Sequence, residues 1–87
     1  MNGRALVAWN LRRLRTDRGL SQERLAADSG VDRAYVSELE RGLGNASVDL
    51  LDRLAELLEV HVGAFFIEPD QDAVPPSPLR SGRRAKA

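Results

Sequence analysis

The sequence predicts an all-α fold, a compact domain of five short helices over residues 1–68 followed by a disordered tail over residues 69–87. Three observations predict it. Apolar residues recur at the three- and four-residue spacing of a helix face. Short polar residues and glycines stand where helices would begin and end. After residue 69 the chain carries three prolines and few apolar residues, so the tail has too little apolar surface to fold.

The first helix is expected from Arg4 to Asp17. Its buried stripe consists of Val7, Leu11 and Leu14, which are spaced i, i+4 and i+7. Trp9 falls on the opposite side of this helix. A large aromatic ring there either folds over the neighbouring tail or forms a contact surface for another protein, and both roles stay open.

Two more helices, joined by a tight turn, are expected near residues 21–29 and 32–41. Ser21 and Asp32 each suit an N-cap, because a short side-chain oxygen can accept a free amide proton of the first turn. Gly30 and Gly42 stand where each helix should stop. The residues expected to face inward are Leu25, Ala26, Val36 and Leu39. A helix-turn-helix of this kind holds its second helix so that it can enter a DNA major groove.

A fourth helix is expected after Ser47, which suits its N-cap, and a short fifth helix over residues 62–66 places Phe65 in the core and Phe66 near its edge. Leu50 and Leu57 lie off the core face of the fourth helix, one heptad apart. They indicate either a dimer interface, together with Phe66 and Trp9, or a wider monomeric core. The expected core face of the fourth helix is Val48, Leu51, Leu54, Ala55 and Leu58.

Charge is unevenly distributed, although the formal net charge is zero. Arginines dominate the first half, whereas residues 49–68 carry five acidic residues and a single base, Arg53. The first half is therefore the part suited to phosphate. A chain of 87 residues is also near the size at which one core is marginally stabilising, so dimerisation would help it.

Composition excludes several kinds of site. Cysteine is absent, which rules out disulfides and thiolate metal sites, and His61 is the single histidine. There is no activated serine or threonine signature, glycine-rich phosphate loop or metal-ligand cluster, so we expect no enzyme, cofactor or metal. The chain also starts without the apolar run of a signal peptide or membrane span, so we expect a cytoplasmic protein without a membrane partner.

Taken in order, the motifs resemble the Cro and C1 repressor type of helix-turn-helix, the XRE family of phage repressors and bacterial regulators. The resemblance runs from about Leu6 to Phe66 and implies a λ-repressor-like fold. Residues 32–37, followed by Gly42-x-x-Asn45, are most similar to the controller proteins of restriction-modification systems. The motifs are Leu11-Arg12-Arg13-Leu14-Arg15, Gly19-Leu20-Ser21-Gln22, Leu25-Ala26, Gly30, Val36-Ser37-Glu38-Leu39-Glu40-Arg41-Gly42 and Asn45-Ala46-Ser47.

The leading residues of the second helix of such a motif meet base edges. Arg33 can donate two hydrogen bonds to guanine, and Ala34 offers a methyl contact to thymine. Ser37 and Glu38 lie one turn later, and Glu38 can accept from a cytosine amino group. The alternatives are a phosphate contact or surface ion pair for Arg33 and a solvated position for Glu38.

Another set of residues is expected to hold phosphate. Gln22 opens a helix whose free N–H groups would point at a phosphate, and the resemblance implies that its amide acts as a clamp. The start of the fourth helix offers a second anion site, although family members often have proline where Ala46 stands. Tyr35 either reaches phosphate or packs against the fourth helix. The full set is Gln22, Arg13, Tyr35, Arg41, Asn45 and Ser47.

The resemblance also implies an internal ion pair between Arg15 and Glu40, which would tie the first helix to the end of the third. The predicted function is a transcriptional regulator that binds double-stranded DNA as a homodimer at a two-fold symmetric operator. The rival hypothesis is a protein-interaction module, antitoxin-like or an adaptor, that uses Trp9, Leu50 and Leu57 to bind another protein. Neutral net charge and Ala34 in a readout position favour this rival.

Overall fold

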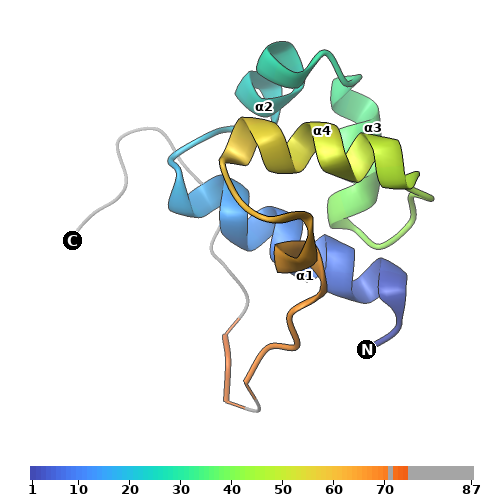
Figure 1. Ribbon diagram of the computed structural model, residues 1–87, viewed down its shortest axis with the longest axis vertical. Coiled ribbons are helices and arrows are strands. Elements are labelled where there is room, and N and C mark those ends of the chain that lie inside the picture. The colour runs from blue at the N-terminus through green and yellow to red at the C-terminus, as the bar shows by residue number, and fades with distance from the viewer. Residues whose placement is uncertain (71, 75–87) are drawn as a thin grey trace.

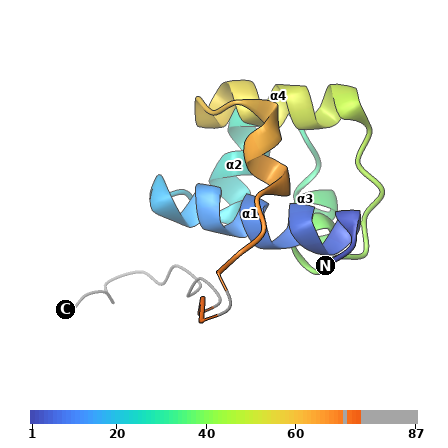
Figure 2. The same cartoon turned by 60° about the horizontal axis from the view of Figure 1, so that its bottom comes forward.

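Four α-helices and one 3₁₀ helix make up the computed structural model, which describes residues 1–70 and 72–74. α1 and α4 lie on opposite sides of the molecule, with α2 and α3 between them and η1 bridging the two sides (Figures 1 and 2). Most of the tail expected to be disordered (residues 69–87), namely residue 71 and residues 75–87, lies outside the described residues. The elements are α1 (Gly3–Asp17), α2 (Gln22–Ser29), α3 (Arg33–Glu40), α4 (Val48–Leu58) and η1 (Val62–Phe66).

Side-chain caps begin three of the four α-helices. Ser21 Oγ accepts from the amide of Arg24 at 3.0 Å, and Ser47 Oγ accepts from Leu50 N at the same distance. Asn2 caps α1 in the same way. Asp32 is the N-cap residue of α3, as expected, but its side chain does not make the expected capping hydrogen bond.

Gly30 stands at the end of α2, and Gly42 stands just after α3, as the sequence predicts. Gly30 is the C-cap of α2, with φ of 76°, and its amide donates to Ala26 O. Gly42 follows α3 with the same φ. A positive φ of this size is costly for residues with a Cβ, so glycine is the residue that allows the chain to reverse at both points.

The core forms where the apolar stripes of all five elements meet. Phe65 of η1 is fully buried, as expected. Val48 is a correction, since it was assigned to the core face of α4 but is 71% exposed. It is the first residue of α4 and follows an exposed loop, so it lies beyond the part of the helix that packs on the core. The buried apolar residues are Val7, Leu11, Leu14, Leu25, Ala26, Val31, Val36, Leu39, Leu51, Leu54, Ala55, Leu58 and Phe65.

One buried amide fixes η1 to α1. Asn10 is 1% exposed, and its Nδ2 donates to the carbonyls of Phe65 at 3.0 Å and Ile67 at 2.9 Å. The same nitrogen donates to Leu6 O within α1. A buried amide is costly unless its hydrogen bonds are made, so Asn10 and the turn that brings η1 back over α1 depend on each other.

Candidate nucleic-acid interface

One face of α3 is open to solvent. The four residues predicted to meet base edges are accessible to solvent. Arg33, Ala34 and Glu38 are exposed, and Ser37 is half-buried. The opposite face of α3 is buried in the core. This packing fixes the helix about its axis, so the open face is the one that α3 can present to a groove.

Arg33 forms an ion pair across the helix-turn-helix. Its Nε lies 3.1 Å from Oε2 of Glu23, which is in the first turn of α2. The two side chains are 56% and 67% exposed. An exposed pair of this kind contributes about 0.2–1 kcal/mol to stability. The surface ion pair left open by the sequence therefore occurs, and it adds little to the stability of the fold.

Tyr35 connects α3 to the loop before α4. Its hydroxyl donates to the carbonyl of Asn45 at 2.8 Å, and its ring packs against the core. A phenol has one proton to donate. A phosphate contact by Tyr35 would therefore compete with this hydrogen bond, whereas the present arrangement holds the loop in place.

The start of α4 presents polar groups at the end of that loop. Asn45 and Ser47 are exposed, and Ala46 is partly buried against the core. Ser47 Oγ accepts from Leu50 N as the N-cap, which leaves its hydroxyl proton available to a ligand. With the free amides of the first turn, these groups suit an anion.

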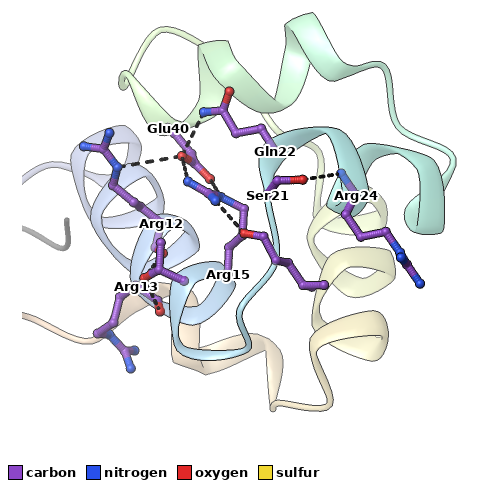
Figure 3. Close-up of polar contacts among 9 residues, drawn as sticks. Arg12, Arg13, Arg15, Ser21, Gln22, Arg24 and Glu40 are labelled. Atoms are coloured by element: carbon purple, nitrogen blue, oxygen red, sulfur yellow. Dashed lines mark hydrogen bonds and ion pairs between the residues drawn. The ribbon is translucent and has the colours of Figure 1, made fainter. Parts of the chain in front are cut away.

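A buried network holds α1, α2 and the end of α3 together (Figure 3). Arg15 donates from Nη2 to Glu40 Oε1 at 2.9 Å and from Nε to Oε2 at 2.5 Å. The same guanidinium donates to the carbonyl of Leu20 at 2.7 Å. The side chains of Arg15 and Glu40 are 4% and 2% exposed. Because desolvation offsets much of the attraction, this bidentate pair orients the helices more than it stabilises them.

Gln22 and Arg12 also converge on Glu40 (Figure 3). The Nε2 of Gln22 donates to Oε1 at 3.0 Å, and the Nε of Arg12 lies 3.9 Å from the same oxygen. The amide predicted to clamp phosphate is therefore already bound on one side to Glu40. Its second N–H makes no hydrogen bond within the part of the chain described, so a phosphate contact remains a prediction.

The two other arginines predicted to contact phosphate lie in different settings. Arg13 on α1 is half-buried and donates from Nε and Nη2 to the Oδ1 of Asn10, at 3.3 and 3.0 Å. Arg41 is exposed immediately after α3. Arg41 also lines a hollow with Trp9 and Arg12 of α1. A phosphate contact by either arginine remains a prediction.

The residues predicted to form a dimer interface are not all brought together. Leu50 and Leu57 of α4 are half-buried against the core, and Phe66 is 46% exposed at the end of η1. Trp9 lines one hollow with residues 67–70 and another with Arg41. Neither hollow includes Leu50, Leu57 or Phe66.

Sequence reasoning missed the polar contacts of three residues. Asn10 and Arg12 act through partners far away in the sequence, and Glu23 pairs with a residue on the next helix. The position of Glu23 in the first turn of α2 was visible as a favourable place for an acidic residue beside a helix dipole. Its pairing with Arg33 was not visible, because it depends on the angle between α2 and α3.

Other kinds of site are not evident in the described residues. Residues 1–70 and 72–74 contain no group of three or more His, Asp or Glu side chains placed to hold a metal ion. Among the same residues, every helix is too short or too polar to cross a bilayer. His61 is exposed, and its Nδ1 accepts from Gly63 N as the cap of η1.

Comparison with known proteins agrees with this architecture. A family model described as "Helix-turn-helix" (HTH_3) matches residues 11–65. The HTH-type transcriptional regulator y4dJ of Sinorhizobium fredii is 47% identical over 60 residues, which are 69% of this chain and 78% of that protein. A hypothetical transcription factor of Neisseria meningitidis is 37% identical over 78% of this chain, and the match spans 64% of that protein's length.

A solved structure is also similar, that of the restriction-modification controller protein C.AhdI from Aeromonas hydrophila. It is 43% identical, with a TM-score of 0.69, and the match covers 72% of this chain and 96% of that one. These relatives are transcription regulators rather than enzymes. The chain therefore belongs to the HTH_3 family of helix-turn-helix transcriptional regulators, the Cro and C1 type.

Proposed function

We propose that this chain is a sequence-specific regulator that acts in the cytoplasm and binds a two-fold symmetric operator as a homodimer, with α3 in the major groove. The open face of α3 carries the proposal. Arg33, Ala34, Ser37 and Glu38 are accessible on it, while Val36, Leu39 and Glu40 on the other side are buried. Arginine and glutamate there supply a donor pair for guanine and an acceptor for cytosine.

Phosphate contacts on both sides of α3 would fix its register. At one side the free amides of α2 begin at Gln22, and at the other those of α4 begin at Val48, behind Asn45 and Ser47. Backbone contacts position a protein on DNA and base contacts give it specificity. Zero net charge is compatible with this division, because the arginines are concentrated in the half that contains the helix-turn-helix.

The dimer is proposed from apolar side chains that the monomer leaves accessible. Phe66 is 46% exposed, and Leu50 and Leu57 are half-buried. A two-fold protein demands a two-fold DNA site. The similarity to C.AhdI favours a controller of restriction-modification genes among the roles of this family.

Selection of binding sites from random duplex DNA with the full chain tests this function. We expect an enriched inverted repeat whose binding weakens as salt rises, because phosphate contacts release counterions. Arg33→Ala serves as the matched control and should show a weaker enrichment, because it lacks one of the base contacts. No enriched sequence from the parent protein would contradict the proposal and would favour a protein-interaction module.

A further inference from the structure

Glu23 stands at an unexpected place for a DNA-binding surface. It is the second residue of α2, directly after Gln22, where the free amides of the helix suit a phosphate. A carboxylate at this position repels phosphate, which should weaken binding to any DNA sequence. The dipole of α2 favours an acidic residue in its first turn, but this explains only local stability.

The contact that Glu23 makes points to a second role. Its Oε2 lies 3.1 Å from the Nε of Arg33, on the neighbouring helix. Within residues 1–70 and 72–74, neither terminal nitrogen of Arg33 takes part in a hydrogen bond. Recognition of guanine O6 and N7 needs two parallel N–H donors. The two terminal nitrogens supply such a pair, and Glu23 holds the guanidinium from its other side.

We propose that Glu23 is a specificity-determining residue that orients Arg33 toward guanine. The inference rests on the proposed function, in which α3 occupies the major groove. In the free protein the pair is exposed and weak. When DNA excludes water, the lower local dielectric strengthens the pair, and the arginine loses less conformational freedom on meeting its base.

The pair also reduces the attraction of Arg33 for phosphate. An unpaired arginine at the start of α3 would contribute to binding of every sequence, because the phosphate charge is uniform along DNA. A carboxylate beside Nε cancels part of that charge while leaving the terminal donors available. Glu23 therefore raises the ratio of operator affinity to random-DNA affinity rather than overall affinity.

The test measures dissociation constants of the full chain for the selected operator and for a random duplex of equal length, at one salt concentration. For Glu23→Gln we expect operator binding to weaken by about tenfold, a fraction of what a complete base contact is worth. Random-duplex binding should stay the same or tighten, because a negative charge near phosphate has been removed. In an Arg33→Ala background, Glu23→Gln should leave the affinity ratio unchanged.

Asp28→Asn is the matched control. Asp28 is the other carboxylate of α2 with an ion pair, and it accepts from Arg24 of the same helix at 2.8 Å rather than from a residue of α3. This variant makes the same change of charge and should keep the affinity ratio. Thermal melts of both variants show whether the fold is intact.

Two results would overturn the role of Glu23. Tighter operator binding by Glu23→Gln with an undiminished ratio would mean that the carboxylate only repels DNA, and equal weakening on both duplexes would mean a general effect. Failure of the proposed function is visible separately, in the proteins that retain Glu23. If the parent prefers no sequence, the proposed function is wrong. If Arg33→Ala keeps the full preference, base reading by Arg33 is wrong, and the role of Glu23 falls with it.

Discussion

Arg15 of α1 and Glu40, the last residue of α3, form a bidentate ion pair that is almost completely removed from solvent. The pair closes the helix-turn-helix onto α1, because the same arginine also binds the carbonyl of Leu20, just before α2. Glu40 accepts from Gln22 as well, so one carboxylate connects α1, α2 and α3. The orientation of the DNA-binding surface therefore depends on a charge pair in the interior.

Removing either partner of this pair should destabilise the fold. Arg15→Ala or Glu40→Ala leaves an uncompensated buried charge, and we expect a loss of about 3–5 kcal/mol in the free energy of unfolding. Chemical denaturation measures this directly. Arg24→Ala, which breaks the exposed pair with Asp28, should cost less than about 1 kcal/mol. If Arg15→Ala unfolds at the same temperature as the parent protein, the pair has no structural role.

Base and phosphate contacts should respond differently to truncation. Arg33→Ala is expected to weaken operator binding by about 1–3 kcal/mol and to leave random-duplex affinity nearly unchanged. Gln22→Ala should weaken both, because a phosphate contact carries no sequence information. Because Gln22 also donates to Glu40, the melting temperature of the Gln22→Ala variant must be measured as well. Equal losses on both duplexes for Arg33→Ala would place Arg33 on the DNA backbone.

The turn of the helix-turn-helix should require glycine at position 30. Gly30 has φ of 76° and open space around its missing Cβ, so Gly30→Ala tests backbone conformation alone. We expect a loss of about 1–2 kcal/mol, the cost of a left-handed conformation for a residue with a Cβ. Gly3→Ala is the control, since Gly3 has equal space and a helical backbone. Equal melting temperatures for the two variants would contradict this assignment.

Introducing a charged residue at the exposed edge of the proposed dimer interface tests that interface. Phe66→Glu should lower the sedimentation mass from dimer to monomer and weaken operator binding, while the 46% exposure of Phe66 lets the monomer stay folded. Leu57→Glu should do the same with added instability, because Leu57 also packs on the core. Val48→Glu, at an exposed position outside the proposed interface, should leave the mass unchanged. If Phe66→Glu stays a dimer and binds the operator as tightly as the parent protein, this face is not the dimer interface.

Local signals in the sequence were enough to place the helices. Ser21, Ser47, Gly30 and Gly42 mark ends that depend on hydrogen bonds and φ values within a few residues. The exposure of Val48 was missed because periodicity assigns a face to a residue but does not say how far the core extends along a helix.

The polar contacts of the surface were only partly predictable. The Arg15–Glu40 pair followed from resemblance rather than from the residues themselves, and the structure contains it. The contacts of Asn10 with η1 and of Glu23 with Arg33 join segments whose relative placement no local pattern specifies. Whether Leu50 and Leu57 complete a core or a dimer likewise depends on a second molecule, and their partial burial fits both.

The most direct test of the account is a hydroxyl-radical footprint of the parent protein on its selected operator, with the mass of the complex measured in parallel. Two copies of α3 in successive major grooves should protect two half-sites whose centres lie about 10 base pairs, or about 34 Å, apart on one side of the duplex. One dimer should occupy each operator. Protection of a single half-site by a monomer, with no second site one turn away, would contradict the account.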